Sequence, residues 1–381
     1  MTKVLHIISD TNIGGAGNHL LNYLRSYDRN RIEVAVAMPR GGMLMERILP
    51  LGVHIYLLDC LRDKSFDIPA IKALSRLIRE DNPDIVHTHG ALSGRIAGKR
   101  CGKHVVFTRH SGFSLNPFFT KGPGKAFFRI INDRYADRII ATSSACRDDM
   151  ISCGVSKSKI DLILNGSPPI AKCSDQERAQ LRLEYGFATD DFLAGIVARI
   201  EPYKGQMFVV EAARILKETD QKVKIIIAGT GSYGDEVKKR AKELGLDDII
   251  VFTGFLQDVA PLFNILDVQI NASYVETSSL SLLEGMSIGL PAIASNDSGN
   301  PLVIQDGVNG LLFKSRDSKA LADCIIRLRS SPELACTLMT GALEVYDSKF
   351  TCERFARDTE ATYTKTMEAF TNGKQPGSKK D

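Results

Sequence analysis

Short apolar runs rich in β-branched residues recur along the first half of the chain, and stretches with helical spacing separate them. In residues 68–80 the apolar positions fall on one face of a predicted helix: Ile71, Leu74, Leu77 and Ile78. Such alternation of strands and helices is typical of a parallel sheet covered by helices. Predicted strands lie at residues 4–8, 33–37, 85–88, 105–108 and 139–141.

The segment 165–172 interrupts this pattern, because it contains Gly166, Pro168 and Pro169. A predicted helix at 174–185 follows, and a second α/β series then begins. We therefore predict an α/β chain of two Rossmann-like domains, each with a doubly wound parallel sheet, facing a central cleft. The second series has predicted strands at residues 192–199, 224–228, 249–253, 268–271, 292–294 and 310–313.

The expected domains follow from these breaks. The bounds are 1–167 for an N-terminal acceptor-side domain, 168–350 for a C-terminal nucleotide-sugar domain, 351–371 for a last helix returning to the N-terminal domain, and 372–381 for a disordered tail. A chain of 381 residues exceeds the size at which one hydrophobic core stops growing, which agrees with two domains.

Composition excludes several classes of protein. With 44% apolar and 25% charged residues, the chain resembles folded globular proteins rather than disordered ones. The formal net charge is only +4 and no run of Lys and Arg occurs, so nucleic acid is not an expected partner. Eight scattered cysteines without metal-ligand spacing indicate a reducing cytoplasm. Because no leader or membrane-spanning stretch is evident, we expect any membrane contact to be peripheral.

Two carboxylates, Glu276 and Glu284, lie eight positions apart in the sequence E-T-S-S-L-S-L-L-E. A helix is expected to begin near Ser278, so that the backbone N–H groups of Ser279 and Leu280 form an anion-binding helix N-terminus. Because carboxylates repel phosphate, the two glutamates are expected to accept hydrogen bonds from sugar hydroxyls. The alternative is that the serines only cap a helix and both glutamates are solvated.

Two cations follow the first strand of the second series. The sequence A-R-I-E-P-Y-K-G at 198–205 places Arg199 and Lys204 five positions apart in a turn. Two such cations can clamp a diphosphate and stabilise the charge that develops on it as a leaving group. Alone, Arg and Lys in a loop are more often solvated.

Glycine-rich loops follow three other strands. The sequence N-I-G-G-A-G at 12–17 lacks the dinucleotide-binding spacing, but Gly15 would let the backbone approach an anion or a sugar closely. Gly229 and Phe255 belong to further loops after predicted strands. Each of these loops could equally be a simple strand-to-helix turn.

All seven histidines lie within the first 110 residues. His110 follows a predicted strand, and His87 and His89 occupy the same kind of position after another strand. Without carboxylates or cysteines nearby, a metal site is disfavoured. We expect His110 to hydrogen-bond a sugar and His87 to be structural.

Taken together, these positions resemble a retaining glycosyltransferase of family 4, which has the two-domain GT-B fold. The resemblance covers residues 4–370, and its most specific parts are the E-x7-E pair, the R-x4-K-G turn and the sequence L-L-E-G-M-S-I-G-L-P-A-I-A-S at 282–295. It implies a metal-independent enzyme that needs no cofactor, retains anomeric configuration and takes a nucleotide-sugar donor, with UDP favoured.

The resemblance also implies roles for individual residues. Glu284 would bind the nucleotide ribose, Glu276 the donor sugar, and Arg199 with Lys204 the diphosphate. In the first domain, Gly15 would lie near the donor phosphate and the acceptor, and His110 would face the transferred sugar. The remaining predicted donor-binding residues are Gly229, Phe255, Ser278, Ser279 and Leu280.

Two departures from the family pattern affect these expectations. Many members have Gly-Phe-Gly after the first glutamate, where this chain has Thr277, Ser278 and Ser279. The loop 298–303, S-G-N-P-L-V, has Leu302 where a glutamate usually follows the proline. The first departure changes how the backbone approaches phosphate, and the second removes a polar contact.

The expected function is hexosyl transfer to a glycan or a polyprenyl- or lipid-linked acceptor in cell-surface polysaccharide or lipopolysaccharide biosynthesis. Residues 118–138 combine Phe and Ile with Lys and Arg, so they could contact an anionic membrane surface, unless they form an ordinary core helix. The alternative functions are a nucleotide-sugar 2-epimerase of the same fold, a nicotinamide-dependent oxidoreductase and a binding protein with a decayed site.

Overall fold

The computed structural model describes residues 1–381 except 12, 62–64, 112, 114, 220–221 and 373–381. The chain forms two compact units, which are described separately. The first consists of Met1–Gly166 together with the chain from Cys352 onward, and the second is Ser167–Thr351. The end of the predicted tail, 373–381, lies outside the described residues.

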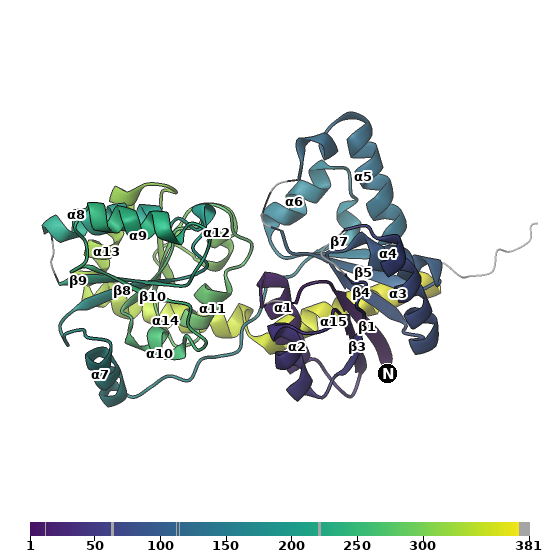
Figure 1. The fold of residues 1–381 in the computed structure, drawn as a ribbon, viewed down its shortest axis with the longest axis horizontal. Coiled ribbons are helices and arrows are strands. Elements are labelled where there is room, and N and C mark those ends of the chain that lie inside the picture. The colour runs from purple at the N-terminus through teal and green to yellow at the C-terminus, as the bar shows by residue number, and fades with distance from the viewer. Residues whose placement is uncertain (12, 62–64, 112, 114, 220–221, 373–381) are drawn as a thin grey trace, which may run out of the picture. The chain divides into compact units, whose positions relative to one another are not determined.

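The first unit contains a seven-stranded parallel sheet in the order β3-β2-β1-β4-β5-β6-β7 (Figure 1). Side chains of β1 contribute to two separate apolar clusters, Val4 and Ile8 to one and Leu5 and Ile7 to the other, so the sheet is buried on both faces. The strands are β1 Thr2–Ile8, β2 Ile32–Met38, β3 His54–Leu57, β4 Ile85–His89, β5 His104–Arg109, β6 Arg138–Ala141 and β7 Ile160–Leu162.

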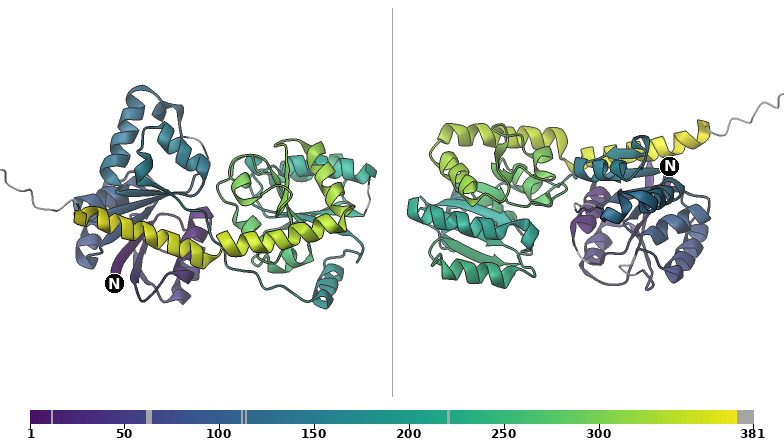
Figure 2. Two further views of the ribbon diagram at one scale, coloured as in Figure 1. Left: turned by 180° about the vertical axis from the view of Figure 1, so that it is seen from behind. Right: turned by 90° about the horizontal axis from the view of Figure 1, so that it is seen from above.

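Helices cover this sheet, and the last helix of the chain, α15, packs against the first helix, α1, and crosses the unit (Figure 2). They are α1 Gly15–Ser26, α2 Met43–Ile48, α3 Ile68–Asp81, α4 Leu92–Arg100, α5 Gly122–Tyr135, α6 Ser144–Ser152 and α15 Cys352–Asn372, with short 3-10 turns η1 Leu49–Leu51, η2 Pro117–Phe119 and η3 Lys157–Lys159.

The second unit contains a six-stranded parallel sheet in the order β10-β9-β8-β11-β12-β13. Its strands are β8 Phe192–Val197, β9 Val223–Ala228, β10 Ile250–Gly254, β11 Val268–Asn271, β12 Ala292–Ser295 and β13 Gly310–Phe313. Its helices are α7 Asp175–Glu184, α8 Gln206–Thr219, α9 Gly234–Glu243, α10 Ala260–Ile265, α11 Leu280–Met286, α12 Asn300–Val303, α13 Ser318–Arg329 and α14 Pro332–Lys349, with the turn η4 Pro202–Lys204.

The prediction of an α/β chain with two doubly wound parallel sheets is confirmed. Two strands, β3 and β7, were not predicted; both are short strands at the edges of the sheet, and Asp161 interrupts the apolar run of β7. In each sheet the strand order reverses between two neighbours, β1 and β4 in the first unit and β8 and β11 in the second. Ligands of open α/β sheets bind at such switch points, beyond the carboxyl ends of the strands.

Candidate active site

The switch point of the second unit brings Lys204 and Glu276 together. Lys204 follows β8 and Glu276 follows β11, and the Lys204 Nζ lies 2.6 Å from Glu276 Oε2. The two side chains are only 17% and 10% exposed, so neither is a solvated surface group. Gly205 makes this turn possible: its φ is +78°, and a Cβ there would lie 2.2 Å from the carbonyl oxygen of Ala272.

The loop after β12 holds Glu276 in place. The backbone N–H of Glu276 donates to Ser298 Oγ (2.9 Å), and Ser298 Oγ donates to the Glu276 carbonyl oxygen (2.7 Å). The N–H of Thr277 donates to Glu276 Oε1 (3.1 Å). Sequence reasoning missed the role of Ser298, although it lies in the loop where the family pattern is altered.

Arg199 remains exposed at the end of β8. Its Nη2 donates to the Tyr203 hydroxyl (2.8 Å), and its carbonyl oxygen accepts from Gln206 Nε2 (2.8 Å). Tyr203 therefore orients the guanidinium while most of its N–H groups face solvent. Tyr203 was not singled out from the sequence, because a tyrosine in a turn carries no distinctive pattern.

Glu284 lies within α11 and is half-buried. Among the described residues its carboxylate has no hydrogen-bond or ion-pair partner, and burial raises its pKa to about 7. A half-buried carboxylate without partners is costly unless a ligand satisfies it. Glu284 is therefore not a fully exposed surface residue.

The helix expected near Ser278 begins two residues later, at Leu280, with Ser279 as its N-cap. Extension backward is prevented because the carbonyl oxygen of Glu276 accepts from Gly299 N–H (3.1 Å) and Ser298 Oγ. Ser278 and Ser279 are buried. Thr277, Ser278 and Ser279 all have negative φ, so this stretch needs no glycine.

Gly229 and Phe255 occupy adjacent loops at the same edge of the sheet. Gly229 has φ +132° and donates its N–H to the carbonyl oxygen of Gly254 (2.8 Å). A Cβ on Gly229 would lie 2.0 Å from the Ala198 carbonyl oxygen, so glycine is structurally required here. Phe255 is 64% exposed.

In the first unit, Gly15 is the first residue of α1, with Gly14 as its N-cap. Apart from its chain neighbours and the backbone of its own helix, no atom of the described residues lies within 4 Å of the position that a Gly15 Cβ would take. Packing therefore does not demand glycine at this position, and open space for a ligand lies next to the backbone. Asn12, in the same predicted loop, lies outside the described residues.

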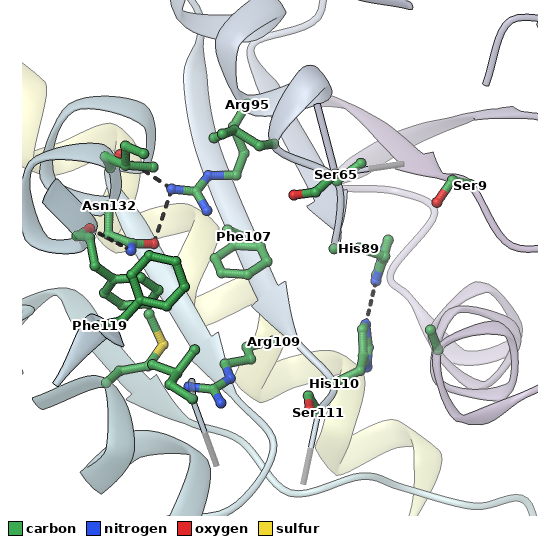
Figure 3. A pocket seen from close by; sticks show the side chains of 18 of the residues that line it. Ser9, Ser65, His89, Arg95, Phe107, Arg109, His110, Ser111, Phe119 and Asn132 are labelled. Atoms are coloured by element: carbon green, nitrogen blue, oxygen red, sulfur yellow. Dashed lines mark hydrogen bonds between the residues drawn. The ribbon is translucent and has the colours of Figure 1, made fainter. Parts of the chain in front are cut away.

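His110 is the end of a hydrogen-bonded chain of side chains, part of which Figure 3 shows. His110 Nε2 lies 3.0 Å from His89 Nδ1, and His89 Nε2 lies 3.0 Å from His6 Nδ1. His6 Nε2 then contacts the Tyr363 hydroxyl (3.3 Å), which also contacts His87 Nδ1 (2.7 Å). The chain ends where His87 Nε2 contacts Thr108 Oγ1 (2.7 Å). Since each neutral imidazole donates one and accepts one hydrogen bond, the chain fixes the tautomers together. Sequence reasoning missed Tyr363, because α15 brings it from the far end of the chain.

Burial keeps these rings neutral. Desolvation lowers the pKa of His6 to about 3 and that of His19 to about 4. It also lowers the pKa of His87, His89 and His110 well below the usual value. His110 therefore presents an uncharged ring.

Two groups of three histidines have ring nitrogens within 4.8 Å of one another. One is His6, His87 and His89, and the other is His19, His89 and His110. Most of these nitrogens already bond to each other, to Tyr363 or, for His19, to Asn165 (2.8 Å). Sequence reasoning did not include His6 and His19 in this cluster.

The predicted amphipathic segment 118–138 forms η2, α5 and the start of β6. Phe118 of η2 and both Phe127 and Ile130 of α5 are exposed, so the apolar side chains of α5 are not all buried in a core. Lys125 and Arg129 on the same helix form no ion pair with a described residue. Among the described residues, no helix is both long and apolar enough to cross a membrane.

Family models match most of the chain. Residues 13–169 match the model described as Glycosyltransferase Family 4, and residues 177–341 match that of Glycosyl transferases group 1. EpsD of Bacillus subtilis, assigned as a glycosyltransferase, is 31% identical over 295 residues, 72% of this chain and 75% of EpsD. An Escherichia coli UDP-Gal:alpha-D-GlcNAc-diphosphoundecaprenol alpha-1,3-galactosyltransferase is 26% identical over 281 residues, 69% of this chain and 70% of that protein.

Solved structures show the same fold. HepE of Anabaena in complex with UDP and glucose superposes with a TM-score of 0.81 at 20% identity, over 96% of this chain and all of HepE. TarM of Staphylococcus aureus, in complex with Fondaparinux, alpha-GlcNAc-glycerol and UDP, gives a TM-score of 0.74 at 14% identity. The fold is GT-B, and the chain belongs to the family 4 type of glycosyltransferases.

Proposed function

We propose that this glycosyltransferase is a retaining, metal-independent hexosyltransferase that uses a nucleotide-sugar donor, with UDP as the favoured nucleotide. The observation that carries this proposal is the pairing of Lys204 with Glu276 at the switch point of the second unit, where Glu284 has no partner among the described residues. These groups match the charges and hydroxyls of a nucleoside diphosphate sugar.

Each of these residues has a proposed role. Lys204 and Arg199 bind the diphosphate and stabilise its negative charge as the bond to the sugar breaks. Glu276 accepts hydrogen bonds from sugar hydroxyls, and Glu284 accepts them from the ribose. When the diphosphate arrives, Lys204 exchanges part of its contact with Glu276 for a contact with phosphate.

The surrounding backbone contributes as well. Ser278, Ser279 and Leu280 are assigned to the phosphates, and the loops with Gly229 and Phe255 to the nucleotide. In the first unit, His110 is assigned to the transferred sugar and Gly15 to the donor phosphate and acceptor.

The proposed acceptor is a glycan or a lipid-linked sugar in cell-surface polysaccharide or lipopolysaccharide biosynthesis. The support is that HepE binds UDP-glucose and that the Escherichia coli relative acts on a sugar linked to diphosphoundecaprenol. We propose a cytoplasmic protein that associates peripherally with the inner face of the membrane. Exposed Phe127 and Ile130, with Lys125 and Arg129 that form no ion pair with a described residue, support contact with an anionic lipid surface.

Two cationic side chains of the second unit support the proposal that the enzyme needs no metal ion. Lys204 and Arg199 supply the positive charge that a divalent cation would otherwise bring to the diphosphate. No cofactor other than the nucleotide-sugar co-substrate is proposed.

Calorimetric titration with UDP, GDP and ADP tests the donor site. We expect one nucleotide to bind. Lys204→Ala should lower the affinity for that nucleotide roughly tenfold to hundredfold, because a charge-assisted contact is lost. Lys217→Ala is the matched control, because Lys217 pairs with Asp248 on the surface of the same unit. Failure of all three nucleotides to bind, or equal binding by Lys204→Ala, would refute the proposal.

A further inference from the structure

The first unit contains a cavity of about 830 Å³ at the carboxyl ends of β1, β4 and β5, which α5 and η2 close on one side (Figure 3). Its lining changes character along its length. His89 and His110 lie toward one end, Arg95, Phe107 and Arg109 occupy the middle, and Phe119 lies toward the other end in this view.

The middle of the cavity carries uncompensated positive charge at Arg95. This side chain is only 5% exposed, and its guanidinium donates to three neutral oxygens: the Ile131 carbonyl (3.3 Å), Asn132 Oδ1 (3.0 Å) and the Tyr135 carbonyl (3.4 Å). No carboxylate of the described residues pairs with it, and burial lowers its pKa to about 10.

Arg109 is a second cation that lines the cavity, and Phe107 lies between it and Arg95 in the view of Figure 3. Its Nη2 donates to Asp149 (2.8 Å) and to the Phe113 carbonyl oxygen (3.0 Å), whereas its buried Nη1 has no hydrogen-bond partner among the described residues. Asp149, which does not line the cavity, balances one of the two arginines. The carboxylate that lines the cavity is that of Asp10, which lies by Gly14 at the start of α1. The two-arginine region therefore has an excess of positive charge, which favours an anionic group there.

The far end of the cavity is apolar. Phe119 and Phe128 pack with ring centroids 5.4 Å apart, and Ile131 lies in the same wall. Phe127 lines the cavity and is also 56% exposed, so the apolar wall continues to the surface, where Ile130 is exposed too. This apolar wall therefore offers a hydrocarbon chain contacts from the cavity to the surface of α5.

We propose that this cavity binds a lipid-linked diphosphate acceptor in three parts: the sugar next to His89 and His110, the diphosphate at Arg95 and Arg109, and the first hydrocarbon units against Phe119 and Phe128. The order of polar, cationic and apolar linings is the order of these parts in such a molecule. A free glycan would use neither the buried cations nor the aromatic wall. This inference rests on the proposed function and narrows its acceptor to one chemical class.

Calorimetry on the full chain with farnesyl diphosphate, farnesol and inorganic pyrophosphate tests the proposal, with UDP present in excess to occupy the donor site. We expect farnesyl diphosphate to bind at least about tenfold more tightly than either fragment, because only it engages both the arginines and the aromatic wall. Pyrophosphate binding as tightly would overturn the proposal in favour of a simple anion site. Equally tight farnesol binding would overturn it in favour of an uncharged ligand.

Variants test whether farnesyl diphosphate binds in this cavity. Phe119→Ser and Arg95→Gln should each weaken the binding of farnesyl diphosphate by about tenfold. The controls are Phe66→Ser, an exposed phenylalanine outside the cavity, and Arg138→Gln, which removes an arginine paired with Asp161 in the same unit. Equal effects of control and cavity variants would overturn the proposal. Phe119 is partly exposed, so its variant tests the site even if Arg95→Gln fails to fold.

Two further readouts separate this inference from the proposed function. Lys204→Ala should leave farnesyl diphosphate affinity unchanged, since that residue belongs to the second unit. If UDP binds and farnesyl diphosphate does not, the cavity assignment fails and the donor assignment stands. If farnesyl diphosphate binds as predicted and no nucleotide does, the donor assignment fails and the cavity assignment stands.

Discussion

The pKa of Glu284 gives the proposed donor site a characteristic dependence on pH. Burial raises this pKa to about 7, and only the ionised carboxylate is a strong acceptor for ribose hydroxyls. Near pH 6 about nine tenths of the free protein would carry the protonated form, and near pH 8 about one tenth. Removing that proton costs roughly 1.4 kcal/mol at pH 6, so UDP should bind about tenfold more weakly there than at pH 8.

Glu284→Gln removes the titrating group while keeping the shape of the side chain. At pH 8 the variant should lose about 1.5–3 kcal/mol of binding free energy, the contribution of a hydrogen bond to a charged group. Near pH 6 the loss should be smaller, because the wild-type residue is then mostly protonated. The phosphate of UDP also titrates in this range, but it does so equally for both proteins.

The assay is calorimetric titration of UDP into both proteins at the two pH values, with Glu333→Gln, an exposed helix residue of the same unit, as the control. The informative quantity is the ratio of wild-type to variant affinity, which should fall as the pH is lowered. A ratio that stays constant between pH 8 and pH 6, or that stays near one, would refute the assignment of Glu284 to the ribose.

Three further predictions concern the histidine chain and metal ions. Tyr363→Phe removes the hydroxyl that bonds two buried imidazoles, so the free energy of unfolding measured in urea should fall by about 1–3 kcal/mol, whereas Tyr185→Phe in the other unit should change it little. His6 and His19 are neutral in the folded protein but protonate below about pH 6.5 in the unfolded chain. The free energy of unfolding should therefore fall as the pH drops from 6.5 toward 4, by about 1.4 kcal/mol per residue at pH 5.5. Equal free energies of unfolding in urea at pH 7 and pH 5.5 would contradict this. Dialysis against a chelator should leave sugar transfer unchanged, and activity that is lost and then restored by a divalent ion would overturn metal independence.

Much of the fold was predictable because buried parallel strands appear as short continuous apolar runs. The strands β1, β4, β8 and β13 correspond to predicted runs, and the first three lie inside a sheet with a strand on each side. The edge strands β3 and β7 were missed because no residue of β3 is fully buried and Asp161 interrupts the apolar run of β7.

Site residues were predictable where they lie together in one short sequence motif. The R-x4-K-G turn and the E-x7-E pair led to Lys204, Glu276 and Glu284, but not to the direct contact between the first two. Ser298 and Tyr363 were missed because they reach their partners from distant segments of the chain. Such contacts depend on the register of packed elements, which no local pattern records.

The central claim is that this protein transfers a sugar from a nucleoside diphosphate. The most direct measurement follows labelled hexose from UDP-, GDP- and ADP-sugars onto undecaprenyl-diphosphate-linked N-acetylglucosamine, together with release of the nucleotide. We predict transfer from one donor, nucleotide release only when the acceptor is present, and loss of both in Lys204→Ala. Absence of transfer from every donor, or donor turnover that needs no acceptor, would contradict the account.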